Sequence, residues 1–122
     1  MKTMLLDPQT WDLVLDASGN IASAENPYAL AQNAASAIRM FLGEQWYNTT
    51  LGVPYLTTGN QSQQLLGSPP NVALMKSIFA RVAKTVPDVI SAKVFITSIV
   101  DRNVRGQVQV TGPDGKVTAA NF

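Results

Sequence analysis

The spacing of apolar positions predicts a helix between residues 26 and 43. Apolar residues three and four positions apart form one stripe, made of Leu30, Ala34, Ile38, Phe41 and Leu42. We expect Asn26 and Pro27 to begin this helix and Gly43 to end it, because these residue types favour those positions. Gln32 and Arg39 fall mostly outside the stripe and are expected to face water.

A second helix is predicted after Pro69 and Pro70. Asn71 is a favourable N-cap, and Pro87 is expected to end the helix because proline cannot continue it. The apolar residues again keep helical spacing and should face the core. They are Met75, Ile78, Phe79, Val82 and Val86.

The remaining apolar segments are typical of strands. Residues 11–16 and 21–24 flank a turn that contains Gly19 and Asn20, and they predict a hairpin. Residues 89–100 are largely apolar on both faces, so this strand is expected in the centre of a sheet, covered on both sides. Residues 104–111 alternate between apolar and polar, and the turn at residues 113–115 leads to a short last strand.

These elements predict an α+β fold in the order β-β-α-α-β-β-β. We expect a small mixed sheet with two helices packed on one face. Residues 1–10 are interpreted as an N-terminal arm, and residues 11–122 as a single domain. The long segment between residues 56 and 70 is expected to be functional or mobile, with Leu65 and Leu66 docking on the core or on a partner.

Composition excludes several classes of function. The chain has no Cys and no His, which removes thiol chemistry, His-based catalysis and most zinc sites. The net charge is +1, and no basic stripe or polybasic tract indicates a nucleic acid or a membrane as partner. No apolar run is long enough for a membrane span or a signal peptide, so we expect synthesis in the cytoplasm. No cofactor is expected.

Glu44 is the candidate for acid catalysis. A carboxyl group beside an aromatic such as Trp46 can act as a general acid, as it does in lysozyme-like enzymes that cleave peptidoglycan. The second carboxylate would be Asp12, Asp16 or Asp88. The alternative is that Glu44 pairs with a nearby arginine or accepts backbone N–H groups in the adjoining turn. Asp12, Asp16 and Asn20 lack the spacing of a calcium loop.

Aromatic residues and strand edges are the candidate interaction features. Trp46 is expected in the core, with Tyr47 or Tyr55 at an edge. Charged residues make up only 14% of the chain, and the strands at 104–111 and 116–119 carry little charge. An edge without charge or bulges invites a strand from another chain, although an ordinary hairpin with a frayed end has the same pattern. We expect the domain to fold without residues 116–122.

Several short motifs, in this order and spacing, resemble the baseplate wedge family of contractile phage tails. This family includes protein W of P2-like phages and the corresponding subunit of type VI secretion baseplates. The matching segments are Trp11-Asp12-Leu13, the turn from Asp16 to Ile21, Ala31-Gln32-Asn33, Ile38 to Glu44, and Leu51 to Tyr55. The glutamine near the start of the helix and the Gly-Glu pair at its end are the most specific of these elements.

The resemblance implies a structural role rather than an enzymatic one. Members join the wedge to the sheath and form the platform on which the sheath polymerises. The implied partners are the tail sheath protein and the other wedge and hub proteins, in six copies per tail, and some members are labelled lysozyme-like. The candidate partner-binding residues are Glu44, Tyr47, Tyr55, Pro87, Asp88, Val104, Val108, Val110, Val117 and Phe122.

The chain departs from the family pattern after the second helix. Many members carry Glu-Pro-Arg there, a motif that contacts neighbouring wedge subunits. This chain has Val86, Pro87 and Asp88 at that place, so only the proline is kept and the charge pattern is lost.

Overall fold

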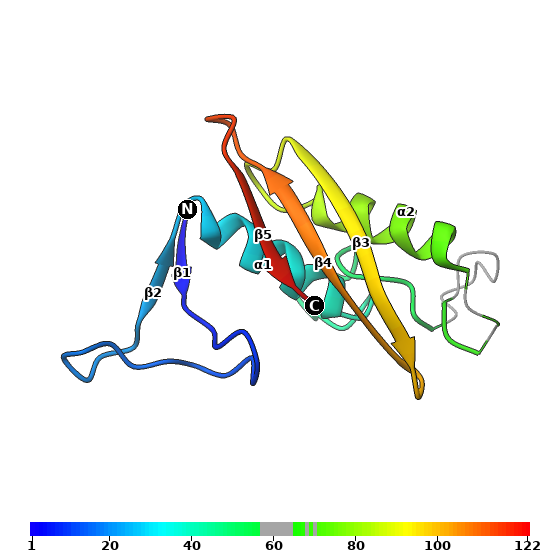
Figure 1. Cartoon of the computed structure of the whole chain (residues 1–122), viewed down its shortest axis with the longest axis horizontal. Coiled ribbons are helices and arrows are strands. Elements are labelled where there is room, and N and C mark those ends of the chain that lie inside the picture. The colour runs from blue at the N-terminus through cyan, green and yellow to red at the C-terminus, as the bar shows by residue number, and fades with distance from the viewer. Residues whose placement is uncertain (57–64, 68, 70) are drawn as a thin grey trace.

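The computed structural model describes residues 1–56, 65–67, 69 and 71–122. The elements in these residues follow the predicted order, which confirms the α+β class (Figure 1). They are β1 (Lys2–Met4), β2 (Ser23–Glu25), α1 (Tyr28–Arg39), α2 (Val72–Ala83), β3 (Ser91–Val100), β4 (Asn103–Thr111) and β5 (Val117–Asn121). Most of the predicted segment between residues 56 and 70 lies outside the described residues.

The C-terminal half forms an antiparallel sheet in the order β3-β4-β5. Figure 1 shows both helices on one face of this sheet, and α1 packs against β4 and β5 while α2 packs mainly against β3. The turn between β3 and β4 uses Asp101 and Arg102, both at positive φ, which suits a two-residue hairpin loop. Val94, Val108 and Val110 point toward the helices and are buried.

Two predictions about these strands are wrong. The strand at residues 89–100 is not central: β3 lies at one edge of the sheet, and its outer face is open, with Phe95 44% exposed. The strand at residues 104–111 is not an edge, because β4 pairs with β3 on one side and with β5 on the other. Apolar residues on the outer face of β3 misled the prediction.

The N-terminal segment forms a small sheet of its own. Strand β1 pairs with β2 in antiparallel register, Thr3 opposite Ala24, so the predicted arm contains a strand that the sequence pattern did not indicate. The hairpin predicted at residues 11–24 is present only in part. One bridge joins Leu15 to Ile21, and the Asp16 N–H donates to the Asn20 carbonyl at 2.7 Å.

The two helices differ in how they begin. Asn71 caps α2 as predicted, since its side chain accepts from the Leu74 N–H at 3.1 Å. The predicted cap of α1 is wrong, because α1 begins after Pro27 and has no side-chain cap. It also ends at Arg39, four residues before Gly43, so the last residues of the predicted stripe follow the helix, and Phe41 is 40% exposed.

Gln32 holds the N-terminal segment to the body. It was expected to face water, yet it is only 1% exposed. Its Nε2 donates to the Met4 carbonyl at 2.7 Å, and its Oε1 accepts from the Leu6 N–H at 3.0 Å. A polar side chain is tolerated in the core here because both ends of its amide group are satisfied by the arm backbone.

Candidate interaction surfaces

The outer edge of β5 offers unpaired backbone groups. The N–H and carbonyl of Phe122 exchange hydrogen bonds with Gly106 on β4, which fixes the alternation along the ladder. Since antiparallel strands alternate hydrogen-bonded and non-hydrogen-bonded pairs, Ala120 and Thr118 also bond to β4. The backbone N–H and C=O groups of Val117, Ala119 and Asn121 therefore point to the free edge.

The β5 edge has none of the usual protection against another strand. Residues 117–121 include no charged residue and no proline, and their pairing with β4 has no register shift. The opposite edge, on β3, carries Lys93 and has a register shift between Ile96 and Ser98. Charges and bulges discourage strand addition, so β5 is the better acceptor of the two edges.

Three of the side chains predicted on the C-terminal surface are turned toward the body. Val108 and Val110 are 0% exposed beneath the helices, so they cannot contact a partner of the folded domain. Phe122 packs edge-on against Phe79, with 5.3 Å between ring centroids. Val117 is the most exposed of the partner-binding residues that were predicted on this sheet, with 65% of its surface exposed. The sequence pattern showed the alternation along β4, but Val108 and Val110 were assigned to a partner and lie in the core.

A cavity of about 700 Å³ opens where the start of β4 meets the end of α1. We call it the arginine groove, because Arg39, Arg102 and Arg105 lie among its lining residues. Three of the predicted partner residues, Tyr55, Val104 and Phe122, also line it. The Tyr55 hydroxyl donates to the Ile38 carbonyl, and burial raises the pKa of this phenol to about 12.

A second groove, of about 410 Å³, brings together residues distant in the chain. We call it the Pro87 groove: Tyr47 and Pro87 line it, together with Gln45 and the end of α1. The Gln45 Oε1 atom is buried and has no hydrogen-bond partner among the described residues. An unpaired buried acceptor is rare in folded proteins and is satisfied when a donor binds beside it.

Trp46 lies next to this groove. The prediction that Trp46 belongs to the core is wrong. It is 89% exposed and packs edge-on against Tyr47, with 5.7 Å between the ring centroids. Tyr47 is 67% exposed, as expected of an edge residue. An exposed, edge-on pair of aromatics beside a groove is the kind of anchor that protein interfaces use.

Glu44 is hydrogen-bonded within the turn that follows α1. Its carboxylate accepts from the Phe41 N–H at 2.9 Å, and the ion pairs of the described residues do not include one between Glu44 and Arg39. The Arg39 guanidinium instead lies 4.1 Å from the centre of the Trp11 ring. Asp88 is exposed and has a positive φ of 69°. Within the described ranges no cluster of three or more acidic residues could hold a metal ion.

The arginine groove is the surface that sequence analysis missed. Arg102 and Arg105 follow the β3–β4 turn, and Arg39 ends α1, more than sixty positions earlier. No local pattern connects them, because the packing of α1 on β4 is what brings them together. The only signal in the sequence is the pair of arginines three positions apart beside a predicted turn.

The model of the contractile injection system sheath initiator family matches residues 2–115. The chain belongs to this family. A sheath initiator is a structural component, and its role implies contacts with the sheath and with components of the tail baseplate. No match was found among curated proteins. In the part of this sheath initiator that the structure describes, no helix has the length and apolar character needed to cross a membrane.

Proposed function

We propose that this sheath initiator joins the baseplate wedge of a contractile tail to the sheath and starts sheath polymerisation by accepting a sheath strand at the edge of β5. In this proposal the initiator is made in the bacterial cytoplasm and is present in six copies per tail. The observation that carries the proposal is the unprotected edge of β5, where the outward backbone groups of Val117, Ala119 and Asn121 have no strand partner among residues 1–56, 65–67, 69 and 71–122.

The chemistry of this edge supports strand addition. Backbone hydrogen bonds supply affinity that does not depend on side-chain identity, while the outer face of β5 supplies limited specificity. Val117 is 65% exposed on that face and offers an apolar contact to a neighbouring strand. The edge belongs to a strand that α1 holds from behind, so it is preformed before the partner arrives.

The Pro87 groove supports a separate contact with the wedge. It combines the exposed Trp46–Tyr47 pair with the proline that the family pattern retains. The unpaired Gln45 Oε1 needs a hydrogen-bond donor, which a wedge backbone N–H or a basic side chain would supply. Because this groove and the β5 edge involve different residues, the two contacts can be tested independently.

Amide hydrogen exchange tests the strand addition directly. Residue-resolved exchange is measured by nuclear magnetic resonance on the initiator with and without the sheath protein of its own system. We expect the amides of Val117, Ala119 and Asn121 to become protected, because they gain carbonyl partners. The amides of Thr118 and Ala120, already bonded to β4, serve as internal controls and should change little. Equal exchange at Ala119 with and without a saturating concentration of the sheath protein would contradict the proposal.

No observation favours the peptidoglycan-cleaving alternative. The Glu44 carboxylate is occupied as the acceptor of a turn N–H, and the family is a structural component. The alternative predicts release of peptidoglycan fragments by the purified wild type and loss of that release in Glu44→Gln. We expect no release by either protein.

A further inference from the structure

The N-terminal segment carries acidic charge without a compensating cation. Residues 5–22 contain three aspartates, Asp7, Asp12 and Asp16, and no lysine or arginine. Asp7 is engaged with its own turn, where its Oδ1 accepts from Gln9 and Thr10. The ion pairs found among the described residues are Lys2–Glu25 and Lys116–Asp114, so Asp12 and Asp16 have no cationic partner there.

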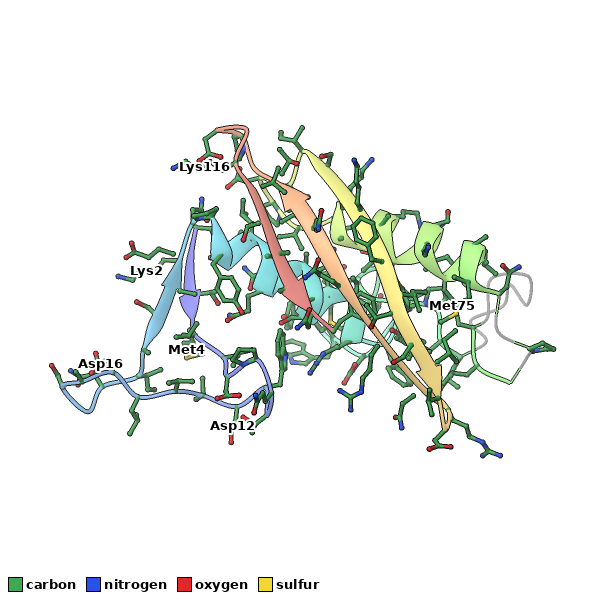
Figure 2. All side chains as sticks on the ribbon, viewed as in Figure 1. Lys2, Met4, Asp12, Asp16, Met75 and Lys116 are labelled. Carbon is green, nitrogen blue, oxygen red and sulfur yellow. The ribbon has the colours of Figure 1, made fainter. Side chains whose placement is uncertain are left out.

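The same segment exposes aliphatic side chains between its aspartates. We call residues 12–21 the arm tip; its exposed members include Leu13 at 48%, Leu15 at 66% and Ile21 at 53%. Figure 2 shows the tip as an extended loop running from Asp12 to Asp16, away from the sheet and helices. Several exposed aliphatic residues on a short loop indicate a surface that is covered in the assembled state.

The arginine groove has the complementary chemistry. Three arginines line it, and the described residues of its lining include no aspartate or glutamate. Its apolar walls include Ile38, Phe79 and Phe122, which belong to the core or pack against it. Arg39 and Arg105 both line this groove, and the pKa of Arg39 is lowered first by burial and then by the nearby positive charge of Arg105.

One chain does not fill its own groove with its arm tip. Trp11 reaches the rim, where it stacks on Arg39, but no arm-tip residue is among those that line the groove. In Figure 1 the arm tip lies at the left of the molecule and the β3–β4 turn, which contributes Arg102 to the groove, lies at the lower right. The far end of the arm tip and the β3–β4 turn therefore lie on different sides of the molecule in this view.

We propose that the arm tip of one initiator binds the arginine groove of a second copy, with Asp12 and Asp16 meeting the arginines and the aliphatic side chains entering the apolar cavity. The inference rests on the proposed function, in which six copies of the initiator are present in one tail. The contact is head-to-tail, and such a contact closes into a ring when successive copies are related by a sixfold rotation about the tail axis. Each copy then contributes one arm tip and one groove.

Self-association of the purified initiator, measured by sedimentation without sheath or wedge proteins, tests this contact. We expect concentration-dependent association that weakens with added salt, because exposed charges are screened. Arg105→Glu should weaken association about tenfold or more. The double variant Asp12→Asn, Asp16→Asn should weaken it equally. Asparagine keeps the side-chain oxygen that accepts the N–H groups of the turn, so the local structure is retained. Lys93→Glu makes the same charge change outside the groove and should leave association unchanged.

A charge exchange and a peptide probe show whether a loss of association comes from the lost contact or from misfolding of the variant. Asp12→Arg combined with Arg105→Asp should restore association to within about threefold of wild type, which loss of folding would not allow. A fluorescent peptide of residues 10–22 should bind the wild type and bind Arg105→Glu about tenfold more weakly. If neither self-association nor peptide binding occurs up to millimolar protein, the proposal is overturned.

Two further outcomes separate this contact from the proposed function. If the amides of the β5 edge are protected by sheath protein but Arg105→Glu leaves self-association unchanged, the arm contact is overturned while strand addition stands. If a sheath or wedge peptide binds the arginine groove and the arm peptide does not, the groove belongs to a different partner. Loss of sheath recognition by the wild type, with self-association intact, contradicts only the proposed function.

Discussion

At the residue scale, the attachment of the N-terminal segment depends on Gln32. Replacing it by leucine removes two hydrogen bonds and leaves the Met4 carbonyl and the Leu6 N–H without partners. We expect Gln32→Leu to lower the free energy of unfolding by about 1–3 kcal/mol, measured by chemical denaturation. The Leu6 amide should also exchange faster with solvent. Ser36→Ala on the same helix is the control, and an equal effect of the two substitutions would contradict this role.

Tyr55 gives the chain a pH dependence above neutrality. Burial raises the pKa of its phenol from 10.0 to about 12, although the charge of Arg39 opposes the shift. In the unfolded chain the phenol ionises first, so the unfolded state loses a proton that the folded state keeps. The free energy of unfolding should therefore fall as the pH rises from about 10 to about 12.

The measurement compares wild type with Tyr55→Phe by chemical denaturation across this pH range. The difference in stability between the two proteins should shrink as the pH rises, since the substitution removes the titrating group. Tyrosinate absorbance supplies a second measurement, in which the ionisation that is lost in Tyr55→Phe should have a midpoint well above the ordinary tyrosine pKa of 10.0. Parallel pH profiles for the two proteins would show that Tyr55 does not carry the effect.

At the scale of elements, Gly106 allows β4 to pass beneath Phe122. A Cβ at this position would meet the Phe95 carbonyl oxygen and lie 2.6 Å from Phe122 Cζ. We expect Gly106→Ala to destabilise the domain by about 1–3 kcal/mol through overpacking, measured by thermal unfolding. Gly115→Ala is the control, because its Cβ meets nothing within 4 Å and only its positive φ of 76° is strained. A smaller loss in Gly106→Ala than in Gly115→Ala would contradict this packing.

The order and type of the helices and C-terminal strands could be predicted because they follow local periodicity. The stripe on α2 identified the buried face of that helix correctly, as Phe79 shows. Strand order could not be predicted in the same way, because the apolar outer face of β3 indicated a central strand. Gln32 and Trp46 were misplaced since their surroundings come from the arm and from a loop, both distant in sequence.

The candidate surfaces were predictable only in part. A low-charge C-terminal edge was visible in the sequence, but the expectation that the domain folds without residues 116–122 disagrees with the packing. Ala120 is 6% exposed and Phe122 packs on Phe79, so this deletion removes part of the core as well as the edge. A test of the edge must therefore keep β5 in place.

At the scale of the whole molecule, the two grooves and the β5 edge give the initiator separable contacts. Trp46→Ala with Tyr47→Ala removes the aromatic pair beside the Pro87 groove. We expect this change to weaken wedge binding at least about tenfold, measured by titration calorimetry, because exposed aromatic pairs dominate interface energies. Sheath nucleation by the free variant should stay as in wild type. Loss of both activities would contradict the separation of the two surfaces.

The central claim is that the sheath begins at the free edge of β5. The most direct measurement is the number of sheath tubes that form when purified initiator is mixed with its sheath protein, counted by electron microscopy. Ala119→Pro removes one N–H from the free edge and keeps the bonds to β4, whereas Ala119→Val keeps that N–H. We predict about tenfold fewer tubes with Ala119→Pro and an unchanged number with Ala119→Val. Equal numbers of tubes with a folded Ala119→Pro would contradict the account.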